Sequence, residues 1–196
     1  VTDGGDTGAN GFAFSGEARV RWENRTEDLT DANAKDDMSR FQVRTLIDIE
    51  KSVDRADVFV QLAHDKTFGD FGQTDPTIEG NVNINQAYVN FAVTDSSSLK
   101  IGRQALVTGN GSIIGRYDHL QDPYSYDGWK FSSSYDDISY DVWSLRVADD
   151  ATDTDIHGLD ANFTDIWGGD LHVHYYHITG YTGAVDHTLD TYGFDW

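Results

Sequence analysis

The sequence predicts an all-β fold, and three observations lead to this prediction. Apolar and polar residues alternate along most of the chain, which is the repeat of a β-strand. No segment shows the 3.6-residue repeat of an amphipathic helix, and clusters of Gly, Asp, Asn and Ser separate the alternating segments. The chain has 196 residues, of which 13% are aromatic, so we expect one domain built of strands.

The alternation begins after a Gly- and Asp-rich start, residues 1–11, which is expected to be a flexible lead-in to a single domain over residues 12–196. In residues 12–25, Phe14, Val20 and Trp22 fall on one side of the expected strand, and charged residues fall on the other. The alternation in residues 82–93 is less regular. The other expected strands are residues 40–50, 56–65, 82–93, 99–107, 129–135, 138–147, 156–163, 171–178 and 189–196.

The connections between these strands alternate in length. Short turns such as residues 52–55 and 136–137 alternate with long loops, which are expected at residues 26–38, 66–81, 108–127, 148–153 and 180–187. This alternation is typical of bacterial outer-membrane barrels, and an apolar face with small residues and aromatic ends suits contact with lipid. The sequence therefore predicts an antiparallel up-and-down transmembrane β-barrel with about ten strands in this chain. A soluble β-sandwich or barrel that binds or cleaves acidic polysaccharide stays open as the alternative.

Composition excludes several classes of protein. Without Cys, the chain has no disulfide scaffold and no thiolate metal site. A formal net charge of −20 argues against nucleic acid as a partner, because an acidic surface repels phosphates. Residues 1–11 lack the basic start and apolar core of a signal peptide, so an exported protein is expected to have lost it already. No nucleophile elbow, P-loop or dinucleotide fingerprint is found, and we expect no enzyme.

Four segments resemble the alginate-export family of outer-membrane porins. They are GEARVRWENR (residues 16–25), FVQLAHDKTFGD (59–70), NQAYVNF (85–91) and LKIGRQALVTGNG (99–111), and YDG at 126–128 resembles an Asp-Gly hairpin entry of the family. The resemblance covers residues 12–147. It implies a bacterial outer-membrane channel in contact with lipid and lipopolysaccharide, which passes small hydrophilic or anionic solutes or acidic polysaccharide. Whether the protein forms homo-oligomers stays open.

Family members are larger barrels of up to about 18 strands, so the resemblance implies that this chain is the N-terminal portion of one. An open half-barrel would leave unpaired strand edges in lipid, which supports the same expectation. The aromatic residues Tyr192, Phe194 and Trp196 also fit the C-terminal signal of a complete barrel, and this alternative stays open.

The candidate pore-lining residues are charged side chains on the polar side of the first two expected strands. Arginine binds carboxylates through its planar fork, which suits anionic solutes, although ion pairs that only brace the wall are the alternative. The resemblance adds Arg103, which strict alternation would place with Leu99 and Ile101 facing lipid unless Gly102 forms a bulge. The candidates are Arg19, Arg21, Arg25, Arg40, Arg44, Arg103, Glu17, Glu23, Asp48 and Glu50.

Metal ligands are sparse in the sequence. His172 and His174 fall on one side of an expected strand and are candidates for zinc, but the sequence indicates no third ligand. No cofactor is expected. Structural Ca²⁺ stays open at two clusters that lack the spacing of a known calcium loop, namely Asp3, Asp6 and Asn10, and Asp149, Asp150, Asp153 and Asp155.

Overall fold

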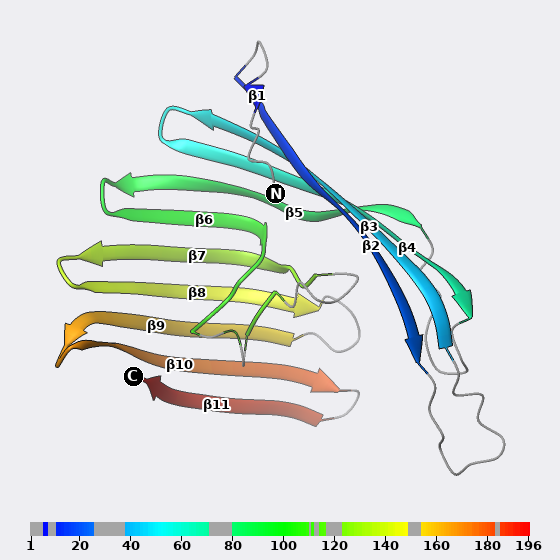
Figure 1. Cartoon of the computed structure of the whole chain (residues 1–196). Coiled ribbons are helices and arrows are strands. Elements are labelled where there is room, and N and C mark those ends of the chain that lie inside the picture. The colour runs from blue at the N-terminus through cyan, green and yellow to red at the C-terminus, as the bar shows by residue number, and fades with distance from the viewer. Residues whose placement is uncertain are drawn as a thin grey trace.

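The computed structural model describes residues 6–7, 11–25, 38–70, 80–109, 111, 114–116, 123–148, 154–182 and 185–196. They form one sheet of 11 strands (Figure 1). No helix among these residues is long and apolar enough to cross a membrane. The strands are β1 (Asp6–Thr7), β2 (Ala13–Arg25), β3 (Met38–Val53), β4 (Ala56–Asp70), β5 (Asn81–Thr94), β6 (Ser97–Gln104), β7 (Tyr126–Tyr135), β8 (Ile138–Ala148), β9 (Thr154–Ile166), β10 (Gly169–Thr182) and β11 (Val185–Asp195).

Each strand pairs antiparallel with the next along the chain, in the order β1 to β11. This confirms the predicted all-β, up-and-down topology, with ten long strands after the two-residue β1. The described residues form a single sheet with no second sheet packed on it, so the alternative of a β-sandwich is wrong. Part of the expected lead-in, Asp6–Thr7, pairs with the start of β2.

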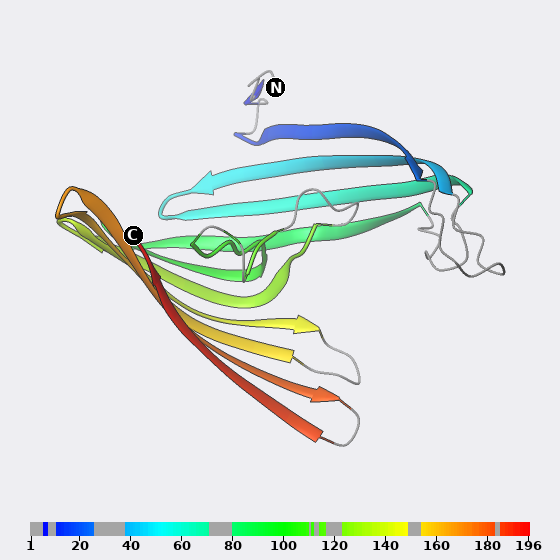
Figure 2. The same ribbon diagram turned by 60° about the horizontal axis from the view of Figure 1, so that its bottom comes forward.

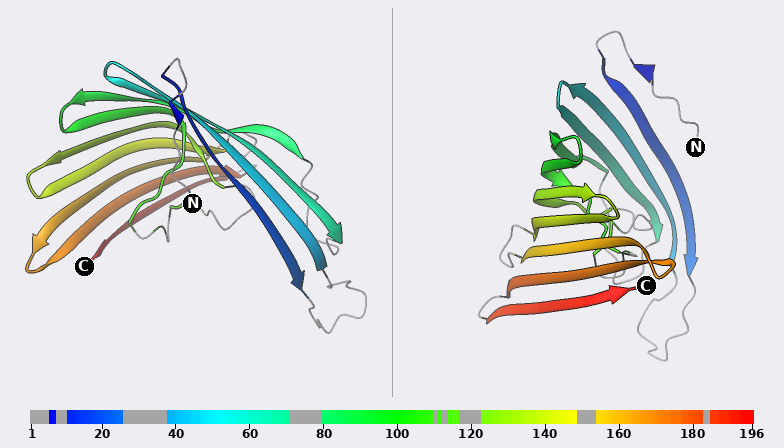
Figure 3. Two further views of the ribbon diagram at one scale, coloured as in Figure 1. Left: turned by 45° about the horizontal axis from the view of Figure 1, so that its top comes forward. Right: turned by 90° about the vertical axis from the view of Figure 1, so that its left-hand side faces the viewer.

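The sheet curves into an open trough (Figures 2 and 3). The long strand β2 lies near one edge and β11 forms the other, and the sheet does not close on itself. Long β2, β3 and β4 cross the direction of the C-terminal strands at a marked angle, as the right-handed twist of a large sheet requires (Figure 1). The described residues between β6 and β7 lie inside the curve (Figure 3).

The two faces of the sheet differ in chemistry. The concave face carries the charged side of β2 and β3, and the convex face carries the apolar side. Large apolar side chains therefore lie exposed on the convex face, as expected for contact with lipid. They include Phe14, Val20, Trp22, Phe41, Ile47, Phe68, Ile84, Phe91, Ile101, Trp129, Tyr140, Leu159, Val173, Tyr192 and Phe194.

Tight turns join the strands at one end of the sheet. Asp54 and Asp136 in these turns, and Asp165 near the end of β9, have positive φ angles of 54°, 48° and 57°. Aspartate tolerates this left-handed conformation better than most residues, because its short side chain bonds locally to the backbone. The longer connections leave from the opposite end, in agreement with the predicted alternation, with one exception. The long loop expected at residues 180–187 is wrong, because β10 and β11 pair through it and leave only residues 183–184 between the strands.

Several strand ends differ from the prediction. β7 begins at Tyr126, before the expected residue 129, and β11 begins at Val185, before the expected residue 189. β4 continues to Asp70, through residues expected in a loop, because its last residues still pair with β3 as far as Ser39. β6 ends at Gln104, so residues 105–107 are not a strand. The irregular alternation in residues 82–93 corresponds to a register shift, in which Gln61 pairs with Gln86 and the next residue, Leu62, pairs with Ile84. This is a β-bulge at Asn85.

Candidate channel wall

Four of the predicted arginines form one patch on the concave face. β2 and β3 pair so that Arg19 lies opposite Arg44, Arg21 opposite Gln42, and Glu23 opposite Arg40. This confirms that the two strands form an antiparallel hairpin with a shared charged face. The acids Glu17 and Glu23 alternate with the arginines, so the patch holds both charges.

The arginines differ in how much of each side chain reaches solvent. Arg44 is 3% exposed and its Nη2 lies 2.7 Å from Glu17 Oε1, whereas Arg40 is 12% exposed and lies 2.9 Å from Glu23 Oε2. Arg21 is 38% exposed, donates from Nε to Gln42 Oε1 at 2.8 Å, and lies 3.6 Å from Glu23. Arg44 is therefore placed to brace the wall, and Arg21 is the arginine best placed to meet a solute.

The remaining predicted residues of these strands lie at the margins of the patch. Asp48 accepts hydrogen bonds from Ser15 Oγ at 3.1 Å and from Gln61 Nε2 at 2.7 Å, so it belongs to the polar network of the wall. Glu50 is exposed near the short turn, on the same face. The side chain of Arg25 lies outside the described part of the structure.

Arg103 does not lie on the concave face. The pairing of β5 with β6 is continuous through Gly102, with Ala87 opposite Arg103 and Val89 opposite Ile101, so the expected bulge is absent there. The convex side chain of Arg103 is 47% exposed and pairs with Asp127 at 2.6 Å. The resemblance therefore misplaced this residue, because strict alternation holds in β6.

The convex position of Arg103 is compatible with a membrane. Arg103 is the second-last residue of β6, at the end from which a long connection leaves. The same cross-strand row runs from Val60 and Ala87 through Arg103 and Asp127 to Arg146. Strands of a barrel are tilted and staggered, so one row can pass from the apolar band to the wet rim.

The described residues between β6 and β7 fold over the concave face. We call these residues, 105–109, 111, 114–116 and 123–125, the inward segment. Leu106 and Ile114 of this segment are buried in one cluster with side chains of β7, β8, β9 and β10. The cluster contains Leu106, Ile114, Tyr126, Trp143, Leu145, Ile156 and Tyr176. The segment therefore narrows the space inside the trough.

The bulge in β5 holds the inward segment at both ends. It presents two consecutive side chains, Asn85 and Gln86, and both donate to Gln61 Oε1. Gln86 Oε1 accepts from Ala105 N at 2.9 Å, and Asn85 Oδ1 accepts from Ser125 Oγ at 2.9 Å. Sequence reasoning missed these residues, although the irregular alternation in residues 82–93 was a signal for them.

Comparison with known proteins agrees with this architecture. The sequence model of the family described as alginate export matches residues 12–192. The chain belongs to the alginate-export family. The match extends the resemblance seen in the sequence, which ended at residue 147, through the C-terminal strands. A comparison with curated proteins finds no match.

Membership of the alginate-export family indicates an outer-membrane export channel. The family is one of transport proteins.

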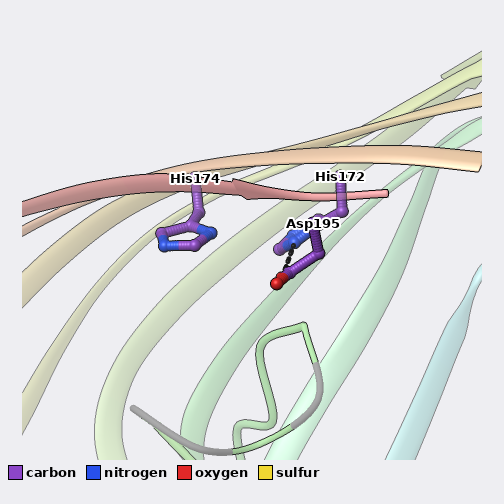
Figure 4. A group of neighbouring side chains, drawn as sticks. All are labelled: His172, His174 and Asp195. Carbon is purple, nitrogen blue, oxygen red and sulfur yellow. Dashed lines mark hydrogen bonds and ion pairs between the residues drawn. The ribbon is translucent and has the colours of Figure 1, made fainter.

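Two histidines of β10 form a second polar group on the concave face. His172 and His174 share the concave face, as predicted, and Asp195 at the end of β11 joins them as a third potential ligand (Figure 4). The sequence did not indicate Asp195, because only the register of β10 with β11 places it opposite His172.

The two clusters considered for Ca²⁺ are described only in part. Asp155 pairs with Arg146 at 2.9 Å. The residues outside the described part of the structure are Asp3, Asn10, Asp149, Asp150 and Asp153.

Proposed function

We propose that the concave face of this chain lines a channel through which an acidic polysaccharide, or small anionic solutes, crosses the outer membrane. One observation carries the proposal. The arginine patch formed by Arg19, Arg21, Arg40 and Arg44 lies on the concave face, and the opposite face of the same strands is apolar and exposed. Charged groups facing inward and apolar groups facing outward are what a channel wall in lipid requires.

The patch suits carboxylate groups for a chemical reason. A guanidinium presents its N–H groups in a planar fork that binds a carboxylate through two hydrogen bonds. Arg21 keeps more than a third of its side chain in solvent and is therefore open to a passing uronate. The nearby Glu17 and Glu23 lower the net charge and let an anion leave again, which transport needs as much as binding.

Reversal potential under a salt gradient tests the sign of the selectivity. Arg21 and Arg40 both lie beside Glu23, so the double substitution Arg21→Ser/Arg40→Ser leaves an uncompensated acid on the wall. In planar bilayers we expect the reversal potential to move toward cations. Glu23→Gln should move it the opposite way, because it removes the acid and keeps both arginines.

Block of the ionic current by an oligouronate tests the solute. The loss of one bidentate contact should raise the Kd for block about tenfold in the double variant, which equals about 1.4 kcal/mol. Arg103→Ser is the control, because it removes an arginine from the convex face. If block and reversal potential stay unchanged in the double variant, the arginines brace the wall and the channel is a weakly selective porin.

A further inference from the structure

We propose that His172, His174 and Asp195 bind a divalent first-row transition-metal ion, such as Zn²⁺, on the concave wall. This inference does not depend on which solute passes the channel. His172 and His174 alternate on β10, and their register partners on β11 are Asp195 and Gly193. The three side chains therefore project from neighbouring strands to the same side (Figure 4).

The spacing of the three residues fits one metal ion. One potential ligand atom from each residue lies within 4.8 Å of the other two. His172 Nδ1 lies 3.5 Å from Asp195 Oδ2, and two ligands that share a tetrahedral Zn²⁺ at about 2.1 Å lie about 3.4 Å apart. Rotation of the His174 ring can close the remaining gap.

Asp160 sets the orientation of His172. Its carboxylate accepts hydrogen bonds from Trp143 Nε1 at 2.8 Å, from Tyr176 OH at 2.7 Å and from His172 Nε2 at 3.1 Å. The proton of a neutral His172 therefore lies on Nε2, and the lone pair of Nδ1 points toward Asp195. Carboxylates behind metal-binding histidines commonly act in this way, fixing the ring and raising its basicity.

A cation can join His172 to Asp195. With the Nε2 proton given to Asp160, Nδ1 and the carboxylate of Asp195 are both acceptors 3.5 Å apart, and a second proton on the ring would join them as a hydrogen bond. A metal ion joins them, and also uses the lone pair of the second imidazole. His174 Nδ1 is shielded from solvent and has no hydrogen-bond partner among the described residues.

The surroundings leave room for the ring and for an ion. A Cβ atom at Gly193 would lie 2.8 Å from His174 Nε2, so a larger residue there would push the ring away. Tyr176 stacks on His174, with ring centroids 4.9 Å apart. A hollow beside the site, lined by Thr108, Gly109, Asp141, Asp160, Asn162 and His172, gives an ion a path from solvent.

The donor set selects the class of metal. Two imidazole nitrogens and one carboxylate oxygen suit Zn²⁺, Fe²⁺, Co²⁺ or Ni²⁺ and leave positions for water. Ca²⁺ and Mg²⁺ prefer sites made of oxygen atoms alone. The ion would join β10 to β11 beneath the inward segment and place positive charge beside Asp160 and Asp195.

Co²⁺ titration of the protein in detergent micelles tests the site. We expect one Co²⁺ per chain with a visible d–d absorption band, and Zn²⁺ should abolish the band by displacing Co²⁺. Asp195→Asn and His174→Gln should each weaken Zn²⁺ binding by at least about tenfold, because each removes a ligand. Asp195 is exposed at the end of β11, so its substitution tests the site without risk to the fold.

His177→Gln is the matched control. His177 is on the same strand but on the convex face, where its Nδ1 lies 2.7 Å from Asp190. This variant should bind Co²⁺ and Zn²⁺ like the wild type. The proposal is overturned if the wild type shows no d–d band, or if His177→Gln weakens binding as much as Asp195→Asn does.

Discussion

The concave wall has two regions of different chemistry. Strands β2 to β5 carry a network of arginine, acid and amide side chains, from Arg44 and Glu17 to Gln61 and Asn85. Strands β7 to β10 carry the apolar cluster around Trp143, which the inward segment covers. The first region is braced by charges and amides beside water, and the second is a small hydrophobic core inside a channel.

This difference shows what each region can do. Exposed side chains such as Arg21 can exchange their partners for water or for a solute at low cost, so the exposed part of the arginine region can bind and release ions. An apolar cluster loses burial when it opens, so the region around Trp143 holds the inward segment in place. We therefore expect substitutions of exposed residues in the first region to alter selectivity, and substitutions of buried residues in either region to alter stability.

Trp143→Ala should have the largest effect on stability. The side chain is 1% exposed, packs against Tyr176 and donates to Asp160. Its loss should lower the free energy of unfolding by about 3–5 kcal/mol, which urea unfolding in phospholipid vesicles can measure by circular dichroism. Trp167→Ala is the control, because Trp167 is 91% exposed in a turn, and an equal loss there would contradict the distinction.

Gln61→Leu should have the next largest effect, because it removes the link between the two regions. Gln61 Oε1 accepts from Asn85, Gln86 and Arg116 Nη2, the last at 3.2 Å in the inward segment. Buried donors left without an acceptor should lower the free energy of unfolding by about 1–3 kcal/mol. We also expect altered single-channel conductance as the segment loosens. Unchanged stability and conductance would mean that water replaces the lost contacts.

Arg44→Gln and Arg21→Gln should separate bracing from selectivity within one patch. Arg44 is buried, so its substitution should lower the free energy of unfolding in urea by about 1–2 kcal/mol and leave Glu17 half exposed. Arg21 is more exposed, so its substitution should lower the free energy of unfolding by less than about 0.5 kcal/mol but weaken oligouronate block more. The reverse order in either measurement would contradict the roles given to the two arginines.

Arg103→Ala should have the smallest effect on the channel. Its pair with Asp127 is half exposed on the convex face, so the free energy of unfolding should fall by less than about 1 kcal/mol. The reversal potential should not change, because the charge does not face the channel. A shift similar to that of Arg21→Ser/Arg40→Ser would mean that Arg103 does reach the solute.

The sequence predicted the parts of the fold that depend on alternation alone. In each of residues 12–25 and 40–50 every charged residue falls on one parity, so the strands, their pairing and the arginine patch follow from the residue types. Arg103 was misplaced only when the resemblance took precedence over that alternation. The same alternation placed His172 and His174 on one face.

Residues that depend on contacts distant in sequence could not be predicted. Asp195 faces His172 only through the register of the last hairpin, and neither residue predicts the other from its neighbours. The inward segment is held by a bulge at Asn85 and by a cluster drawn from four strands. An irregular alternation indicates that a bulge exists, but the partner of the bulge depends on the folded sheet.

The left-handed aspartates of the tight turns have an electrical consequence. Asn or Gly would adopt the conformation of Asp54 and Asp136 without charge, so these turns place fixed negative charge at this end of the sheet beyond what their shape requires. Fixed acids at the end of a channel raise the concentration of cations there, and salt screens the effect. The cation conductance should therefore exceed that of an Asp54→Asn/Asp136→Asn variant at low salt and approach it at high salt.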